Sequence, residues 1–165
     1  MAIEHCMISF SLVFLATVTI LLAGQARAQS LCDKADYQPL CLSVIKGQTD
    51  AHLALESAIT VLISQSQRAK ISAGKKGDSQ NLDVCKENFD DAISNLKTSL
   101  KNLKNGDMAS LNINLSAALT DFVTCDDTFV ESSETNPIGK TDTLLSHMAS
   151  NCLYLSSLIH KGHHN

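Results

Sequence analysis

The chain has 165 residues, a formal net charge of −4, no Trp and only 4% aromatic residues. An acidic chain of this kind is a poor partner for nucleic acid. Its length fits one domain around one core, and many Leu, Ala, Lys and Ser residues beside few aromatic ones predict an all-α fold.

Residues 1–28 have the pattern of a secretory signal peptide. An apolar run from Met7 to Ala23 precedes Ala26-Arg27-Ala28, a small-residue cleavage motif, although no Lys or Arg stands before the run. A retained signal anchor is the alternative. After removal, residues 29–165 contain no stretch apolar enough to span a membrane, so we expect one soluble, secreted domain.

A short segment bounded by two cysteines opens this mature chain. Cys32 and Cys41 are nine residues apart around Pro39, a spacing that suits a local disulfide. We therefore expect a hairpin at residues 30–47 that is closed by this bridge.

Two amphipathic stretches follow, with apolar residues at every third or fourth position, the period of an α-helix. The first begins at the N-cap residue Asp50 and ends in the stretch from Ala73 to Asp78, and the second runs from Ser79 to Lys104. The inward positions are Leu55, Ile59, Leu62 and Ala69 in the first stretch, and Leu82, Cys85, Phe89, Ile93, Leu96, Leu100 and Leu103 in the second.

Two further helices are predicted after the break at Asn105. Gly106 suits a left-handed C-cap and Asp107 an N-cap, while after the polar linker 131–135 we expect Asn136 as N-cap and Pro137 as the first helical residue. Short connections predict an antiparallel, up-down-up-down four-helix bundle over residues 50–161. The inward positions are Met108, Leu111, Leu115, Ala118 and Phe122, then Leu145, Met148, Cys152, Leu155 and Ile159.

The remaining cysteines fit this bundle. Cys85 and Cys125 each lie 20 residues from Asn105, so antiparallel helices place them side by side and predict a second disulfide. Cys152 is too far along the bundle axis to pair with Cys125. Because it falls on the apolar stripe, we expect a buried free thiol rather than a reactive one. Cys6 leaves with the signal peptide.

Motifs for catalysis are missing from the sequence. There is no Gly-x-Ser-x-Gly, phosphate-binding loop or His-Glu-x-x-His, and we expect no enzyme activity, cofactor or metal. His160, His163 and His164 read as a solvated tail rather than a metal site. Asn114 begins a glycosylation sequon at an outward helix position, with occupancy left open. Two other functional classes are alternatives to a protein that binds another protein. They are a carrier of small apolar ligands and a redox or metal-binding protein.

Several segments together resemble the plant invertase and pectin methylesterase inhibitor family. They are the Cys32–Cys41 clip, Val84 to Ala92, Asn105-Gly106-Asp107, Leu115 to Thr120, and Thr124 to Asp127. The resemblance spans essentially the whole mature chain. It implies an N-terminal helical hairpin, a four-helix bundle, both disulfides and a protein that inhibits an enzyme.

The family divides by target. Invertase inhibitors typically carry Pro-Lys-Phe after the Gly-Asp of the second turn, where this chain has Met108-Ala109-Ser110. That difference, the Ser110–Ile113 segment and the extra cysteine in the last helix favour pectin methylesterase as the partner. We expect a secreted inhibitor of the apoplast or cell wall, monomeric when free, that covers the pectin-binding cleft in a one-to-one complex. Acid invertase is the alternative target.

The expected contact residues come from the second and third bundle helices. Glu87 and Asp91 are one turn apart and project away from the core. By position, the resemblance adds Asn112 and Asp127 to them as polar contacts of the inhibitor face. Phe89 replaces a family tyrosine, and its stripe position places it in the core rather than in the contact set.

Overall fold

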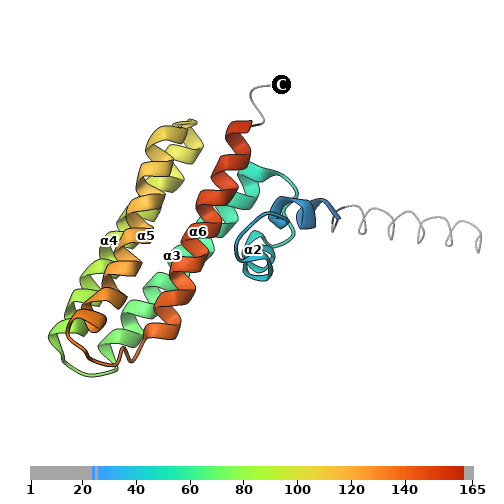
Figure 1. Ribbon diagram of the computed structural model, residues 1–165. Coiled ribbons are helices and arrows are strands. Elements are labelled where there is room, and N and C mark those ends of the chain that lie inside the picture. Colours follow the sequence, from blue (N-terminus) through green and yellow to red (C-terminus); the bar gives the residue numbers. More distant parts are fainter. Residues whose placement is uncertain (1–23, 25, 162–165) are drawn as a thin grey trace, which may run out of the picture.

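Apolar spacing and polar caps determine where the helices begin and end. The computed structural model describes residue 24 and residues 26–161, with side chains described as far as Ile159. Residues 26–32 are helical. The described chain has no strand, so the all-α prediction is confirmed. The helices labelled in Figure 1 are α2 (Gln38–Ile45), α3 (Ala51–Gly74), α4 (Gln80–Asn105), α5 (Met108–Glu131) and α6 (Gly139–Lys161).

The four long helices lie side by side in an antiparallel bundle (Figure 1). Helix α3 packs on α4, α4 on α5 and α5 on α6, while α6 returns to α3 and closes the ring. The short helix α2 packs against α3 and α6, on the side of the bundle away from α4 and α5. The predicted bundle with a preceding helical hairpin is therefore confirmed.

Two of the predicted N-caps are in place, and Ser79, which starts the second predicted stretch, caps α4 in the same way. The side chains of Asp50, Ser79 and Asp107 each accept a hydrogen bond from the backbone N–H three residues later, at 2.9, 3.3 and 3.0 Å. Gly106 ends α4 at φ 72°, a left-handed conformation that glycine adopts without strain. These caps explain why the chain reverses within two residues between α4 and α5.

The predicted start of the last helix is wrong by two residues. We expected Pro137 as the first helical residue, but α6 begins at Gly139. The Asn136 side chain accepts from the N–H of Ile138 at 2.9 Å, and the N–H of Gly139 reaches the Asn136 carbonyl at 3.3 Å. These bonds close a tight turn around Pro137. The first α-type bond of the helix then runs from the N–H of Asp142 to the carbonyl of Ile138 at 3.0 Å.

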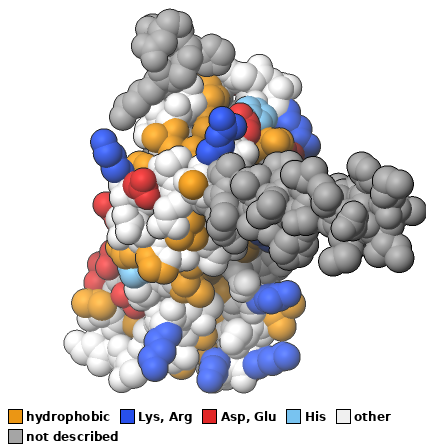
Figure 2. Space-filling model, turned by 90° about the vertical axis from the view of Figure 1, so that its right-hand side faces the viewer, with side chains coloured by type: hydrophobic (Ala, Val, Ile, Leu, Met, Phe, Trp, Pro, Cys, Tyr) orange, Lys and Arg blue, Asp and Glu red, His pale blue; other side chains and the backbone are white. Residues whose placement is uncertain are grey.

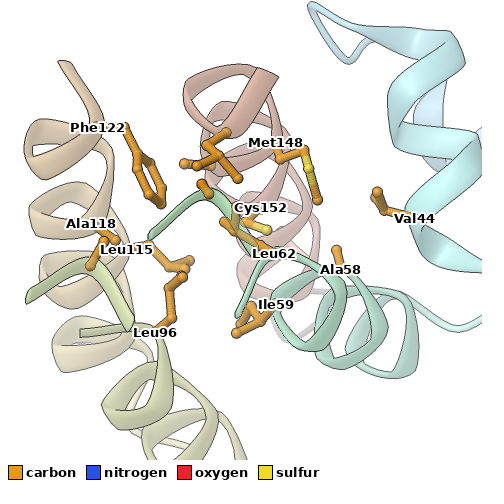
Figure 3. Packing of buried hydrophobic residues seen from close by; sticks show 14 of the residues in the cluster. Val44, Ala58, Ile59, Leu62, Leu96, Leu115, Ala118, Phe122, Met148 and Cys152 are labelled. Carbon is orange, nitrogen blue, oxygen red and sulfur yellow. The ribbon is translucent and has the colours of Figure 1, made fainter. Parts of the chain in front are cut away.

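The core lies along the bundle axis, where the inward stripes meet (Figure 3). The rings of Phe89 and Phe122 join α4 to α5, with centroids 6.3 Å apart. The predicted inward residues are buried, apart from Leu100, Met108 and Ile159, which are partly buried at the margin of the core. A core filled by side chains from all four helices fits the inhibitor class better than the carrier of apolar ligands.

The N-terminal hairpin is fixed to the bundle by polar and apolar contacts. The Asn151 side chain donates to the Tyr37 carbonyl at 3.1 Å, and the rings of Tyr37 and His147 stack with centroids 3.6 Å apart. Ser57 of α3 donates to the carbonyl of Val44 at 2.8 Å. Val44 itself is buried and lies toward Ala58 of α3 (Figure 3).

Some predictions fall on parts of the chain that the structure leaves out. Residues 1–23 and 25, most of the predicted signal peptide, lie outside the described residues, as do His163, His164 and the side chain of His160. Across the helices that are described, none is both long and apolar enough to cross a membrane.

Candidate protein-binding face

The two predicted disulfides are present. Cys32 bridges Cys41 in the hairpin, and Cys85 of α4 bridges Cys125 of α5 with Cα atoms 4.6 Å apart. The second bridge lies in the core and joins the two helices that were expected to carry the contact surface. It holds their outer side chains in a constant relative position.

Cys152 is a free cysteine that is completely buried on α6. Burial raises the pKa of its thiol to about 12. Because the thiolate is the reactive form, this side chain stays protonated and unreactive at neutral pH. A redox role through Cys152 is therefore disfavoured.

Glu87 and Asp91 are exposed on the outer side of α4, as expected. Next to them Asn95 donates to Asp121 of α5 at 2.9 Å, which links the two helices. Burial raises the pKa of Asp121, and the nearby charge of Asp91 adds to this effect, although the Asn95 amide opposes it. We call Glu87, Asp91, Asn95 and Asp121 the α4–α5 face, an acidic surface held by a disulfide beneath it.

Asn112 and Asp127 do not join this face. Asn112 is half-buried and its side-chain oxygen accepts a hydrogen bond from Ser156 of α6 at 2.5 Å. Asp127 is exposed but lies with Asp142 and Ser146 around a small pocket between α5 and α6. The four predicted contact residues thus fall into two groups on opposite flanks of α5. Spacing along one helix does not reveal which neighbouring helix each flank meets.

The pocket between α5 and α6 contains a buried acid that sequence analysis missed. Asp142 is 1% exposed and lies with Asp126 and Asp127 at a pocket of about 170 Å³. Burial raises the pKa of Asp142 to about 7, and the charge of Asp126 adds to the effect. A signal was available in the sequence, because Asp142 lies three residues before Leu145 on the apolar stripe of α6.

A basic groove lies on the opposite flank of α4, between α3 and α4. It encloses about 560 Å³, and its charged lining residues are Lys70, Lys86, Lys97 and one acid, Asp90. Two of these lysines are paired with acids, Lys70 with Asp90 and Lys86 with Asp83, each at 2.5 Å. On the face that carries α2, basic side chains lie toward both ends of the bundle, with several at the end where α3 stops and α6 starts (Figure 2). Charge is thus distributed unevenly around the bundle.

Asn114 is less accessible than predicted. We expected an outward position for this sequon, but the residue is half-buried and its side-chain nitrogen donates to the Ser110 carbonyl at 2.8 Å. That nitrogen is the atom to which a glycan would attach. The side chain is therefore only partly accessible, because the position lies at the margin of the buried stripe.

Comparisons with known proteins agree on one family. A family model described as "Plant invertase/pectin methylesterase inhibitor" matches residues 26–155. The chain is 39% identical over 66 residues to "Pectinesterase inhibitor 12" of Arabidopsis thaliana, a match covering 40% of this chain and 38% of the relative. It is 34% identical over 87 residues to a "Putative invertase inhibitor" of Platanus orientalis, covering 52% and 49%. The matches thus span half or less of these relatives.

Solved structures resemble the same bundle. A mutant form of a pectin methylesterase inhibitor from Arabidopsis superposes with a TM-score of 0.69 at 17% identity, covering 79% of this chain and 95% of that one. A second pectin methylesterase inhibitor from Arabidopsis thaliana gives a TM-score of 0.60 at 17% identity and covers 81% and 95%. At this identity the likeness establishes the fold alone.

Proposed function

The chain belongs to the plant invertase/pectin methylesterase inhibitor family, a family of enzyme inhibitors rather than enzymes, and from this membership we propose that it is a secreted inhibitor of a plant pectin methylesterase. The observation that carries the choice of target is the start of α5. There Met108-Ala109-Ser110 follows Gly106-Asp107, in place of the Pro-Lys-Phe typical of invertase inhibitors. The additional cysteine in α6, Cys152, also supports this target.

Acid invertase is the second candidate. One relative with a longer matched region, the Platanus orientalis protein, bears the name of an invertase inhibitor. The two targets make opposite predictions in an enzyme assay, so they are separable in one experiment.

The proposed mechanism is steric. The α4–α5 face meets the enzyme beside its substrate cleft, in a one-to-one complex that keeps pectin from the catalytic groups. Glu87 and Asp91 supply exposed carboxylates for contacts with donors of the enzyme. The Cys85–Cys125 bridge keeps α4 and α5 from shifting against each other, so less conformational freedom is lost on binding.

Secretion is part of the proposal. The apolar run and the Ala26-Arg27-Ala28 motif support export, and two disulfides are typical of proteins that fold in an oxidising compartment. N-terminal sequencing of the protein recovered from the medium of a secreting host should begin at Gln29. A product that retains residues 1–28 would contradict export by cleavage.

The target is tested by assaying the oxidised protein against a plant pectin methylesterase and a cell-wall invertase, side by side at mildly acidic pH. We expect inhibition of the esterase alone. Inhibition of invertase alone would establish the second candidate, and inhibition of neither enzyme would reject the proposal.

The face is tested with the double variant Glu87→Ala/Asp91→Ala. We expect its inhibition constant for the esterase to rise about tenfold or more, which corresponds to about 1.4 kcal/mol, with an unchanged melting temperature. The matched control is Asp33→Ala, an exposed acid on the hairpin. Unchanged inhibition by the double variant would exclude this face.

A further inference from the structure

Asp142 is an acid without the partners that normally accompany a buried carboxylate. The residue is 1% exposed, and within the described part of the chain neither carboxylate oxygen accepts a hydrogen bond of normal geometry. No ion pair involves it there either, since the three salt bridges found join other residues. Buried acids are usually hydrogen-bonded or paired with a cation, so this carboxylate lacks a positively charged neighbour.

Among the described residues, the charged neighbours of Asp142 are acidic, and its carboxylate is favoured only by its place in the first turn of α6 and by the backbone of Asp126. Asp126 and Asp127 of α5 line the same pocket of about 170 Å³, together with the hydroxyl residues Thr143 and Ser146 of α6. Asp126 accepts a hydrogen bond from a neutral group, the side-chain amide of Asn136, at 2.9 Å. The pocket therefore attracts a positive charge.

The rim of the pocket is suited to contact with another protein. Val123 lines the pocket and is 43% exposed, and Val130 is 69% exposed. Val123 stands three residues before Asp126, and Val130 stands three residues after Asp127. One face of α5 therefore carries two acids between two exposed apolar side chains. In protein interfaces, contacts that surround a strongly bound side chain exclude water from it, and these two valines could do the same for an ionic contact at the pocket.

We propose that the pocket lined by Asp126, Asp127 and Asp142 receives a cationic side chain, arginine or lysine, of the protein that this chain inhibits. The identity of that protein rests on the proposed function, whereas the chemistry of the pocket does not. A metal ion fits less well, because no group of His, Cys, Asp or Glu among the described residues has an arrangement that would hold one. A guanidinium offers several donors in a plane and can satisfy two carboxylates at once.

The pocket is tested first with small probes. The protein, purified from a secreting host and labelled with nitrogen-15, is titrated at pH 7.5 with Nα-acetyl-arginine amide, Nα-acetyl-lysine amide and the neutral analogue Nα-acetyl-citrulline amide. We expect saturable shifts of the amides near Asp126, Asp142 and Ser146 with one or both cations and not with citrulline. Asp142→Asn and Asp126→Asn should each abolish them, whereas Asp33→Asn should not. Equal shifts with citrulline, or none with any probe, would overturn the inference.

The enzyme assay separates this inference from the proposed function. If the chain inhibits pectin methylesterase or invertase, Asp142→Asn and Asp126→Asn should each raise the inhibition constant about tenfold when it is measured above pH 7, where the Asp142 carboxyl group is ionised. Their melting temperatures should not fall, so lost folding cannot explain the effect. Inhibition that both variants leave unchanged overturns the pocket as a contact site while the proposed function stands. If neither enzyme is inhibited, the proposed function fails and the titration alone decides the pocket.

Discussion

Asp142 occupies a position on α6 where the helical periodicity predicts an apolar residue. Because a carboxyl group is buried there, the stability of the folded chain depends on pH. The pKa of the carboxyl group is raised from 3.8 to about 7 in the folded chain. Below pH about 4 the group is protonated in both states. Between pH 4 and 7 the unfolded chain releases the proton while the folded chain keeps it, so stability falls as pH rises through this window.

We expect Asp142→Asn to remove this dependence. The variant should be more stable than the parent at pH 8, by up to about 4 kcal/mol, and nearly equal to it at pH 4. Urea denaturation at several pH values, with Asp33→Asn as control, measures the difference. A variant that loses stability at pH 8 would mean that the ionised carboxylate has a favourable partner in the folded protein.

Cys152 leads to a second prediction at this scale. Because burial raises the pKa of the thiol to about 12, Ellman's reagent should not react with the native protein at pH 8. After unfolding in guanidinium, one thiol should titrate per mature chain, and none in Cys152→Ala. Rapid reaction of the native protein would contradict the buried position.

Residue-level roles were the least predictable from sequence. Glu87 and Asp91 were placed correctly on an exposed surface, because a polar residue opposite an apolar stripe must point outward. Asn112 was grouped with them, yet it bonds Ser156 of α6. The sequence does not tell on which flank of α5 each neighbouring helix packs, and that arrangement decides whether a polar side chain faces solvent or another helix.

The positions of the helices can be predicted well from the sequence, because capping residues and apolar spacing determine where each helix begins and ends. The N-caps predicted at Asp50 and Asp107 are hydrogen bonds to a backbone N–H only three residues later, so the sequence alone is enough to recognise the residues that form them. The start of α6 was placed two residues early because Asn136 forms a bond to Asp126 as well as a turn around Pro137. That contact joins residues ten apart and belongs to packing, not to helix propensity.

The α4–α5 pair gives a prediction at the scale of elements. The double variant Cys85→Ala/Cys125→Ala should lower the free energy of unfolding by about 2–4 kcal/mol, because the bridge closes a loop of 40 residues. The matched variant Cys32→Ala/Cys41→Ala opens a loop of only nine residues and should cost about 1 kcal/mol less by the same relation. Urea denaturation of both variants tests the order. A larger loss from the hairpin bridge would show that strain or hairpin packing outweighs loop entropy.

The whole molecule is a bundle with chemically different sides. The acidic α4–α5 face, the basic groove between α3 and α4, and the acidic pocket between α5 and α6 occupy successive flanks of the ring of helices. A partner that binds across α4 and α5 therefore meets negative charge on two flanks and positive charge on the third. Such a pattern selects one orientation of the complex.

We expect the free protein to be a monomer. Its net charge is −4, and its larger exposed apolar residues are distributed over α3, α5 and α6 rather than joined in one broad patch. Size-exclusion chromatography with light scattering should give the mass of one mature chain across a wide concentration range. A mass that rises toward two chains would indicate that the exposed face of α5 pairs with a second copy. The exposed residues are Leu53, Ile71, Ile113, Val123, Val130 and Leu144.

The position of α2 has a practical consequence. The described chain starts beside α2 and finishes at the end of α6, so both of its ends belong to the half of the bundle formed by α2, α3 and α6 (Figure 1). An affinity tag, a fluorophore or a biosensor surface attached at either end therefore leaves α4 and the outer side of α5 free. The molecule can therefore be immobilised or fused to another domain without covering the α4–α5 face.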